Sequence, residues 1–442
     1  MRVSIDKSSI NGEVFAPSSK SYTHRAVTLG ALSKEAIIHR PLISADTLAT
    51  IQACEMFGAD IERQEDSLLI RGVNGKPGIP EDVIDAANSG TTLRLMTAIA
   101  ALTDGITVLT GDASLRSRPN GPLLETLNKL GVKAFSTRGN ERAPIVVKGG
   151  LEGAIAKIDG SVSSQFISAL LIACPLAESS TTLSIIGEMK SKPYVGVTLE
   201  MLGLAGAEIH TDINNGIKFI IPGKQRYNLK EYTVPGDFSS ASYLLAAAAL
   251  GEGASITIKN LFPSKQGDKV IIEILKRMGA DINWEENTGT VIITGGKTLQ
   301  AINFDAGEAP DLVPTVAVLA SFAEGTSRIE NAEHVRYKET DRLHALATEL
   351  PKLGVQLKEE KDSLTITGVP LKFPEDPQKP LETSLKGTPL HGWHDHRIVM
   401  ALAVAGMVLG NTSIDTTESI SVSYPDFFRD LCRLGAKIQK IA

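Results

Sequence analysis

The stretch VIIEILKRMGADINWEENTGTVIITGG, residues 270–296, contains the unit from which most of the chain is built. Apolar residues recur at every fourth position from Val270 to Met278, which predicts a helix, and Gly279 occupies the usual C-terminal stop. A short strand, a polar turn and a β-branched strand over 290–294 follow. The stretch therefore predicts a repeat unit in which a helix is followed by two antiparallel strands.

The same pattern recurs around five further glycines. These are Gly58, Gly131, Gly206, Gly354 and Gly435. Successive glycines are 73 to 75 residues apart up to Gly354, and the proline-rich loop 371–390 helps to account for a last spacing of 81. A fixed period of this length indicates repeated supersecondary units. Six copies in 442 residues predict two domains of three units each.

The sixth copy reaches the end of the chain without a closing strand, and the N-terminus offers a candidate. Residues 2–6 have the length and alternation of the other closing strands. We therefore expect residues 2–17 to complete the sixth unit, which brings the two ends of the chain close together. The alternative is that residues 2–6 form an unrelated edge strand.

Composition excludes several classes of protein. A hydrophobic content of 42% and a mean hydropathy of +0.02 are typical of a soluble globular protein. A net charge of −6 argues against nucleic acid as the main partner. The longest apolar run, 398–410, is too short to span a bilayer. Three widely spaced cysteines match no metal or disulfide spacing, and no signal peptide is present, so we expect a reducing, cytoplasmic compartment.

Cations recur at or near the predicted helix starts, where the helix dipole disfavours them. They are Lys20, Arg25, Arg94, Lys338, Arg342 and Arg397, with Arg116 and Arg118 in a loop before another helix. Lys338 and Arg342 are four residues apart, so we expect them to share a helix face and repel each other. An acidic protein that keeps cations in these positions is expected to bind a small, multiply anionic ligand.

Hydroxyl and acidic groups at the helix starts have a simpler interpretation. Serines 18, 19 and 21, and the aspartates Asp237 and Asp311, are expected N-caps. The run Ser163-Ser164-Gln165 exceeds the needs of one cap and suits a hydroxylated or phosphorylated ligand, although capping alone remains an alternative. Gly90 either allows the backbone to approach a ligand or is merely a turn residue.

The segment 391–397 contains three histidines and an aspartate, which raises the question of a metal site. Their spacing matches no zinc motif, so polar residues at the start of a helix are the better interpretation. The chain also lacks a Walker loop, a dinucleotide fingerprint and a Ser-His-Asp or cysteine nucleophile arrangement. The sequence therefore indicates neither a nucleotide, nor a metal, nor a covalent mechanism.

Several short motifs, taken together and in order, resemble one enzyme family across essentially the whole chain. They are Lys20-Ser-x-x-x-Arg25, Asn88-Ser-Gly-Thr-Thr-Leu-Arg94, Arg118-Pro119, Ser163-Ser-Gln165, Lys338-Glu-Thr-Asp-Arg342 and Asp395-His-Arg397. The sequence is similar to the 5-enolpyruvylshikimate-3-phosphate synthases. Each motif alone is weak, and the set is specific.

The resemblance implies an α/β fold of two similar domains, each of three βαβαββ units, in the inside-out α/β barrel arrangement of the enolpyruvyl transferases. One domain would comprise residues 18–235, and the other residues 236–442 completed by residues 1–17. The active site is expected in the cleft between them. The resemblance also implies a monomer, with no nucleic acid, membrane or cofactor involved.

The family transfers the carboxyvinyl group of phosphoenolpyruvate to the 5-hydroxyl of shikimate 3-phosphate by addition and elimination, releasing phosphate without a metal. Carried over, shikimate 3-phosphate would contact Ser21, Arg25, Ser163, Ser164, Ser191, Tyr194 and Lys338. Phosphoenolpyruvate would contact Gly90, Arg118, Arg342 and Arg397, with Lys20 and Gln165 between the two ligands. Asp311 would accept the hydroxyl proton and Glu339 would protonate the methylene carbon.

The sequence departs from some family members at two positions. Val422 stands where some members carry a lysine that contacts phosphoenolpyruvate, and His334 stands where some carry an asparagine on the shikimate side. Gly90 is retained, so the resemblance predicts inhibition by glyphosate and weaker inhibition of Gly90→Ala. The differences at Val422 and His334 are expected to change the affinity for the substrates, and they leave the core set of site residues intact.

Two alternatives share features of the repeat. The sister transferases that act on UDP-N-acetylglucosamine generally carry a reactive Cys or Asp in the loop that corresponds to 114–119, and this loop has neither. Sliding clamps also have six-fold repeats, but they need a basic ring interior, which an acidic chain with cations at helix starts fits poorly.

Overall fold

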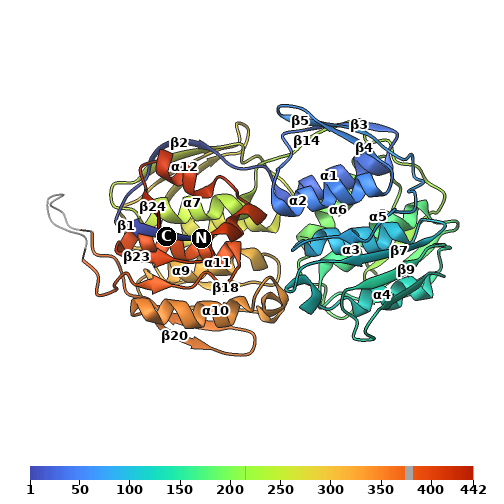
Figure 1. Cartoon of the computed structure of the whole chain (residues 1–442). Helices are drawn as coiled ribbons and strands as arrows, with labels where there is room; N and C mark the ends of the chain where they lie inside the picture. Colours follow the sequence, from blue (N-terminus) through green and yellow to red (C-terminus); the bar gives the residue numbers. More distant parts are fainter. Residues whose placement is uncertain (215, 374–381, 442) are drawn as a thin grey trace. The chain divides into compact units, whose positions relative to one another are not determined.

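A computed structural model describes residues 1–214, 216–373 and 382–441, so the centre of the proline-rich loop lies outside the described residues. The chain packs as two compact units, each drawn in Figure 1. Unit 1 contains Met1–Pro17 and Pro235–Ala442, and unit 2 contains Ser18–Val234. Each unit is described below by itself.

Over its described residues, unit 2 contains twelve strands and six α-helices, with two 3-10 turns. The strands are β3 (Glu35–His39), β4 (Asp60–Arg63), β5 (Ser67–Arg71), β6 (Ile84–Asp85), β7 (Ile106–Thr110), β8 (Lys133–Ser136), β9 (Ile145–Lys148), β10 (Ile155–Asp159), β11 (Thr181–Ile186), β12 (His210–Asp212), β13 (Lys218–Ile221) and β14 (Glu231–Thr233). The helices are α1 (Lys20–Leu32), α2 (Ala45–Met56), α3 (Gly90–Ala100), α4 (Gly121–Lys129), α5 (Ser164–Ala173) and α6 (Lys192–Leu204), with η1 (Leu115–Ser117) and η2 (Cys174–Leu176).

Unit 1 repeats this content over its described residues. Its strands are β1 (Arg2–Asp6), β2 (Asn11–Phe15), β15 (Ser255–Lys259), β16 (Asp281–Glu285), β17 (Thr290–Thr294), β18 (Asn303–Asp305), β19 (Thr326–Glu330), β20 (Gln356–Glu359), β21 (Leu364–Thr367), β22 (Pro389–Leu390), β23 (Thr412–Ile414) and β24 (Lys437–Ile441). Its helices are α7 (Phe238–Leu250), α8 (Ile271–Arg277), α9 (Val313–Ser321), α10 (Arg342–Glu349), α11 (His396–Leu409) and α12 (Phe427–Arg433). Its 3-10 turns are η3 (Gly267–Val270), η4 (Pro310–Leu312), η5 (Glu333–Tyr337), η6 (Leu350–Leu353) and η7 (Thr417–Val422).

In the part of the chain that the structure describes, the strands form six four-stranded sheets of one pattern. In the sheet β2-β15-β17-β16, β2 runs parallel to β15, while β17 is antiparallel to both β15 and β16. The other five sheets are β14-β3-β5-β4, β6-β7-β9-β8, β10-β11-β13-β12, β18-β19-β21-β20 and β22-β23-β1-β24. The predicted βαβαββ repeat is therefore confirmed, and the stretch 270–296 forms η3, α8, β16 and β17.

The repeat glycines have the backbone conformation that their position requires. All six follow a helix with positive φ, from +82° at Gly206 to +113° at Gly435. This left-handed region strains residues that carry a Cβ, so glycine is favoured at the point where each helix turns into its first antiparallel strand. The period visible in the sequence is thus a period of helix ends.

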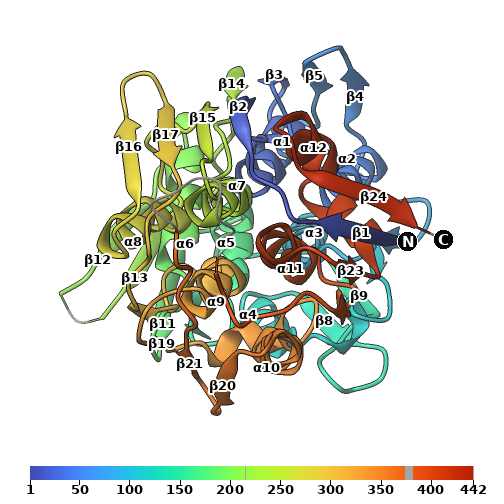
Figure 2. The same cartoon turned by 90° about the vertical axis from the view of Figure 1, so that its left-hand side faces the viewer.

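The N-terminal segment divides between two sheets. β1 pairs antiparallel with β24 and β23, so residues 2–6 close the sixth sheet as predicted, and both chain ends lie side by side in unit 1 (Figures 1 and 2). The prediction that all of residues 2–17 belong to the sixth unit was wrong, because β2 pairs with β15 in the fourth sheet. The strand after a closing strand behaves in the same way elsewhere: β6 follows the closing strand β5 and joins the next sheet.

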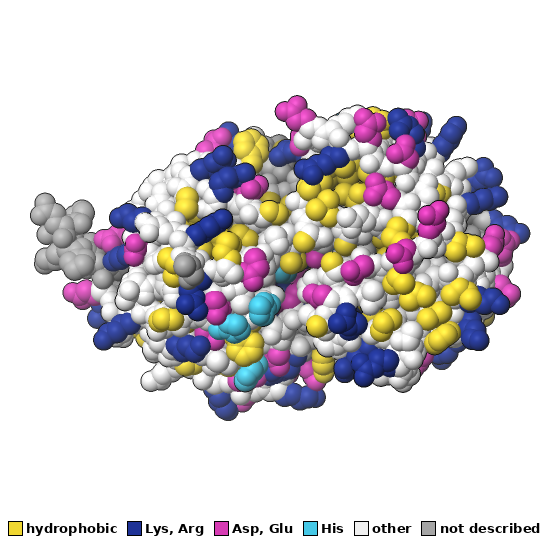
Figure 3. All heavy atoms as spheres, in the orientation of Figure 1, with side chains coloured by type: hydrophobic (Ala, Val, Ile, Leu, Met, Phe, Trp, Pro, Cys, Tyr) yellow, Lys and Arg dark blue, Asp and Glu magenta, His cyan; other side chains and the backbone are white. Residues whose placement is uncertain are grey.

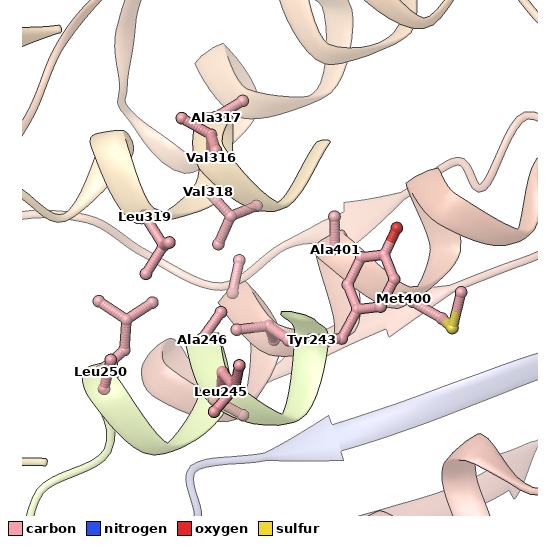
Figure 4. Packing of buried hydrophobic residues seen from close by; sticks show 14 of the residues in the cluster. Tyr243, Leu245, Ala246, Leu250, Val316, Ala317, Val318, Leu319, Met400 and Ala401 are labelled. Atoms are coloured by element: carbon pink, nitrogen blue, oxygen red, sulfur yellow. The ribbon is translucent and has the colours of Figure 1, made fainter. Parts of the chain in front are cut away.

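Each unit has its own hydrophobic core built on three buried helices. In unit 1 these are α7, α9 and α11, whose residues Tyr243, Ala246, Val318 and Ala401 pack together in Figure 4. In unit 2 the corresponding helices are α1, α3 and α5. Nearly all residues of these helices are buried, as expected for a helix surrounded by sheets and other helices. Among the described residues, no helix combines the length and apolar character needed to cross a membrane.

Candidate functional site

Helix starts carry most of the predicted site residues in both units. In unit 2, α1 begins at Lys20, α3 begins at Gly90 and α5 begins at Ser164. In unit 1, α10 begins at Arg342 and Arg397 is the second residue of α11. Arg25 and Arg94 lie in the second turn of their helices, slightly deeper than expected. The cations therefore belong to two constellations, one in each unit.

Arg25 is the most deeply held cation of unit 2. Its side chain is buried, and it donates to the hydroxyls of Thr198 (2.7 Å) and Ser168 (3.3 Å) and to the carbonyls of Ser21 (2.8 Å) and Tyr194 (3.1 Å). Burial lowers the pKa of the guanidinium to about 10, so the group stays charged at neutral pH. Neutral oxygens fix its orientation without neutralising its charge.

Gly90 lies where two guanidinium groups converge. A Cβ built on Gly90 would lie 2.5 Å from Nη1 of Arg94 and 3.2 Å from Nη1 of Arg118. Arg118 also donates to Asn88 Oδ1 (3.2 Å) and Ser114 Oγ (3.1 Å). Gly90 is therefore required for space, and the space it leaves is bordered by positive charge.

The amide of Gln165 has a fixed orientation. Its oxygen accepts a hydrogen bond from Arg94 Nη1 (2.5 Å), and its nitrogen donates to Thr91 Oγ1 (2.9 Å). Arg94 lies over the ring of Phe166, with Cζ 5.3 Å from the ring centre. Sequence reasoning listed Arg94 among the misplaced cations but missed this contact, which only the packing of α3 against α5 reveals.

The remaining unit 2 residues lie at helix starts with different local geometry. Lys20 Nζ pairs with Asp46 Oδ2 at 2.8 Å, a partner that sequence analysis missed. The side chain of Ser163 caps α5 by accepting a hydrogen bond from the backbone N–H of Gln165 at 3.3 Å. Ser191 precedes α6 in the left-handed region, with φ at +53° and no side-chain cap bond. Ser19 occupies the N-cap position of α1 but makes no cap bond with its side chain, which corrects that expectation.

Asp311 is the centre of the unit 1 constellation. Its carboxylate contacts Arg342 Nη1 at 2.9 Å, Arg397 Nη2 at 3.0 Å and Lys338 Nζ at 3.8 Å. Burial alone would raise the pKa of Asp311, but Arg397, Lys338 and Arg342 together lower this pKa far below its usual value, despite the opposing effect of Glu339. Asp311 caps neither η4 nor α9, so the capping expectation was wrong.

Arg342 connects three carboxylates although it is almost completely buried. It contacts Asp395 Oδ2 (2.8 Å), Glu339 Oε2 (2.6 Å) and Asp311 Oδ1 (2.9 Å). Burial disfavours its charge, yet these three carboxylates raise the pKa of the guanidinium above its ordinary value. Asp395 also caps α11 by accepting from the Arg397 amide at 2.8 Å. A buried charge of this kind needs close partners, and the geometry provides them.

The predicted repulsion between Lys338 and Arg342 does not arise on a helix. Lys338 ends η5 in an extended conformation, and α10 begins only at Arg342. Both cations contact the carboxylate of Asp311, which reduces their repulsion. Burial lowers the pKa of the Lys338 ammonium, and Asp311 opposes that effect.

Arg336 anchors the segment that carries Lys338 and Glu339. It donates to both oxygens of Asp341 (3.0 and 2.8 Å) and to Glu359 Oε1 (2.6 Å). It also donates to the carbonyls of residues 360 and 361. Asp341 in turn caps α10 by accepting from the amide of residue 344. The segment before α10 is thus tied to the hairpin β20–β21.

Neither the two positions that depart from the family, His334 and Val422, nor the histidine-rich segment 391–397 forms a metal site among the described residues. His334 is buried in η5, and Val422 ends η7. The three cysteines are free, two of them buried. Over residues 1–214, 216–373 and 382–441, no group of three or more His, Cys, Asp or Glu side chains has the geometry to bind a metal ion.

The chain matches the family described as EPSP synthase (3-phosphoshikimate 1-carboxyvinyltransferase) over residues 5–431. The chain belongs to this family. It is 75% identical over 441 residues to the 3-phosphoshikimate 1-carboxyvinyltransferase of Methanosarcina mazei, a match that covers 100% of this chain and 99% of the relative. The enzyme of the same description from Methanococcoides burtonii is 64% identical and covers 99% of both chains.

A solved structure of an EPSP synthase has the same fold. The enzyme from Acinetobacter baumannii superposes with a TM-score of 0.81 at 27% identity, covering 99% of this chain and 100% of that one. Membership of the EPSP synthase family confirms the predicted resemblance and the transferase class. The match favours neither the sugar-nucleotide transferases nor the sliding clamps.

Proposed function

We propose that this member of the EPSP synthase family transfers the carboxyvinyl group of phosphoenolpyruvate to the 5-hydroxyl of shikimate 3-phosphate, using the two constellations described above. The assignment of roles depends on one observation. The carboxylate of Asp311 contacts both Arg342 and Arg397, and Glu339 contacts Arg342 as well. This arrangement combines two carboxylates for proton transfer with two arginines for an anion. The chain would act in the shikimate pathway, which leads to the aromatic amino acids.

Unit 2 supplies most of the proposed shikimate 3-phosphate contacts. Arg25 is buried and charged, and it is held by neutral oxygens, which suits a phosphate dianion. The other proposed contacts are Ser21, Ser163, Ser164, Ser191 and Tyr194, together with Lys338 of unit 1. Lys20 and Gln165 would lie between the two substrates.

Phosphoenolpyruvate carries a carboxylate and a phosphate. Three arginines and one glycine are proposed to contact it: Arg118, Arg342, Arg397 and Gly90. Gly90 leaves room beside Arg118 in unit 2, while Arg342 and Arg397 present guanidinium groups in unit 1. Bidentate contacts of this type are strong for both anionic groups. The substrate would compete with Asp311 for the donors of Arg342 and Arg397.

The reaction needs one proton to leave oxygen and another to reach carbon. As the 5-hydroxyl oxygen bonds to C2 of phosphoenolpyruvate, Asp311 would take the hydroxyl proton and Glu339 would protonate C3, giving a tetrahedral intermediate. In the elimination step Glu339 would recover a proton from the C3 methyl group, the double bond would reform, and phosphate would leave with the proton from Asp311. The cations would stabilise the developing charge on phosphate.

Asp311 is a weak base when three cations surround its carboxylate, because its pKa is held so low. The arrival of an anionic substrate on Arg342 and Arg397 would compensate part of that positive charge. The basicity of Asp311 would then rise in the complex, where the hydroxyl proton must be accepted. Substrate binding and base activation would therefore be coupled through the same arginines.

The test is phosphate release in the presence of a chelator, with phosphoenolpyruvate and either shikimate 3-phosphate or UDP-N-acetylglucosamine. The proposal expects release that requires shikimate 3-phosphate and persists with the chelator. Release that requires the sugar nucleotide, or no release with either acceptor, would overturn it. The monomeric state and the cytoplasmic location stay predictions, which sedimentation and cell fractionation would test.

A further inference from the structure

The loop 391–395, between β22 and α11, has a backbone conformation that needs support. Trp393 and His394 are consecutive and both left-handed, with φ of +56° and +51°. This region is energetically unfavourable for residues other than glycine, so surrounding contacts must hold it. The loop leads directly into Asp395 and Arg397, so its conformation determines where α11 begins. Histidine and acidic side chains gather over α10 on this face of unit 1 (Figure 3).

One buried carboxylate holds the first half of this loop. Glu349, the last residue of α10, is 1% exposed. Its Oε2 accepts from the backbone amide of His391 at 3.0 Å, and its Oε1 accepts from the indole Nε1 of Trp393 at 3.0 Å. Lys352 donates to both oxygens at 2.8 Å and offsets the buried charge. Glu349 therefore binds the loop through two separate donors.

The other side of the loop is held by residues at the end of β23. Asp415 accepts from the amide of Gly392 at 2.9 Å and contacts His391 Nδ1 at 2.7 Å. A Cβ on Gly392 would clash with Val399 and would come within 2.6 Å of the Asp415 carbonyl oxygen. The backbone of the loop is thus confined between α10 on one side and the end of β23 on the other.

The two ends of α10 contact the two ends of the loop. Arg342 and Glu349 are seven residues apart, which is almost two turns, so they share one face about 10 Å apart along the axis. Arg342 contacts Asp395 at 2.8 Å, while Glu349 contacts His391 and Trp393. The helix therefore fixes the loop with an arginine at one end and a glutamate at the other.

We propose that Glu349 is a positioning residue that sets the location of Asp395 and Arg397 through this loop. The inference rests on the proposed function, in which Arg342 and Arg397 bind phosphoenolpyruvate. Glu349 itself lies at the far end of α10 from Arg342 and is assigned no substrate contact. Without the two hydrogen bonds from the loop to Glu349, Trp393 and His394 could leave the left-handed region. This change would displace the N-terminus of α11 and Arg397 with it.

The test compares Glu349→Gln with Trp393→Phe, which removes the indole donor and keeps an aromatic ring. Loss of one hydrogen bond to a charged group is expected to raise KM for phosphoenolpyruvate roughly tenfold in either variant, with KM for shikimate 3-phosphate changed less than twofold. The matched control is Lys352→Arg, which keeps a cation beside Glu349 and leaves both loop contacts, and should change neither KM. Unchanged KM for phosphoenolpyruvate in both test variants, with only lower thermal stability, would overturn the proposal.

A second readout separates this inference from the proposed function. The chain has two tryptophans, so Trp284→Phe leaves Trp393 as the sole indole. Hydrogen exchange of this indole N–H, followed by NMR, should be at least several-fold faster after Glu349→Gln and unchanged after Lys352→Arg. If the parent protein releases no phosphate, the proposed function fails while the exchange result still reports on the loop. Equal exchange with and without Glu349 would show that Glu349 does not hold the loop.

Discussion

The two units hold their arginines in opposite ways. In unit 1, Arg342 is surrounded by the carboxylates of Asp311, Glu339 and Asp395. In unit 2, Arg25 is equally buried, but among the described residues it donates to hydroxyl and carbonyl oxygens. Two units built from similar repeats thus hold a buried arginine in a charged setting in one unit and in a neutral setting in the other.

This difference suggests a division of labour. A buried arginine with neutral partners keeps its positive charge available, at the cost of desolvation, until an anion binds. An arginine with carboxylate partners is stable without a ligand, and it can exchange one carboxylate for a substrate anion. Under the proposed function, unit 2 would serve mainly for binding, while unit 1 would couple binding to the protonation of its acids.

The largest effect should come from Asp311→Ala in unit 1. General acid–base groups contribute roughly 10²- to 10⁴-fold to catalysis, so kcat should fall by about that factor. Because Asp311 competes for Arg342 and Arg397, the affinity for phosphoenolpyruvate should stay the same or rise. Steady-state phosphate release gives kcat, and calorimetric titration gives Kd.

The control for this variant is Asp281→Asn, which changes an exposed carboxylate of unit 1 that pairs with Lys297. It should retain most of the activity. A parallel fall in kcat and in affinity for phosphoenolpyruvate after Asp311→Ala would assign Asp311 to binding and would remove the contrast between the units.

Asp311→Asn should reveal the charge balance of unit 1 in its stability. Removing one partner from buried ion pairs typically costs about 3 kcal/mol, which is expected here in the free energy of unfolding at neutral pH. The pKa of Asp311 is lower in the folded state, so its contribution is present above its unfolded pKa of about 4 and is lost as the pH falls further. Urea unfolding of both proteins should therefore give a constant difference from pH 7 to pH 5 and a smaller one below pH 4. A pH-independent difference would contradict the assignment.

Arg25→Ala should affect binding in unit 2 far more than chemistry. Loss of a charge-assisted hydrogen bond to phosphate, about 2 kcal/mol, should raise KM for shikimate 3-phosphate roughly 30-fold while kcat changes less. Arg25→Lys should restore only part of the affinity, because an ammonium lacks the planar fork. Arg71→Ala is the control, since Arg71 pairs with Asp60 on the exposed side of a sheet. A kcat loss as large as that of Asp311→Ala would contradict the division of labour.

The fold was largely predictable from sequence because its period depends on local chemistry. Each repeat ends its helix at a glycine with positive φ and continues into β-branched strands, and both signals are visible in the letters alone. The destination of β2 was missed because strand pairing between sheets depends on three-dimensional order, while residues 11–15 only show that a strand exists.

The site was predictable as a set of misplaced cations but not as a set of contacts. The sequence indicated that Arg342 opposed its helix dipole, yet three carboxylates from separate segments compensate it. The capping prediction for Asp311 failed for the same reason, because a local rule yielded to a long-range ion pair. Glu349 gave no sequence signal at all, since its loop partners are more than 40 residues away.

Gly90→Ala should have a moderate effect in unit 2. The added methyl group would meet the guanidinium end of Arg94 and approach that of Arg118, so the backbone need not move but both guanidinium groups must shift. A misplacement of this size should raise KM for phosphoenolpyruvate by roughly tenfold and weaken glyphosate inhibition in parallel. Gly203→Ala in α6, where a Cβ meets nothing within 4 Å, is the control. Equal glyphosate inhibition of Gly90→Ala and the parent would contradict the role of Gly90.

The smallest effect concerns Ser163, whose hydroxyl caps α5 and is also proposed to bind shikimate 3-phosphate. Ser163→Ala should lower stability by about 1 kcal/mol through loss of the cap, whereas Ser163→Gly should cost only a few tenths, because glycine is tolerated at N-caps. Both variants lack the hydroxyl, so both should raise KM for shikimate 3-phosphate about fivefold. Comparing thermal unfolding with KM in the two variants therefore separates capping from binding. If KM stays at the parent value in Ser163→Gly, the serine is a cap alone, and the binding surface of unit 2 depends on its arginines and not on its helix-start hydroxyls.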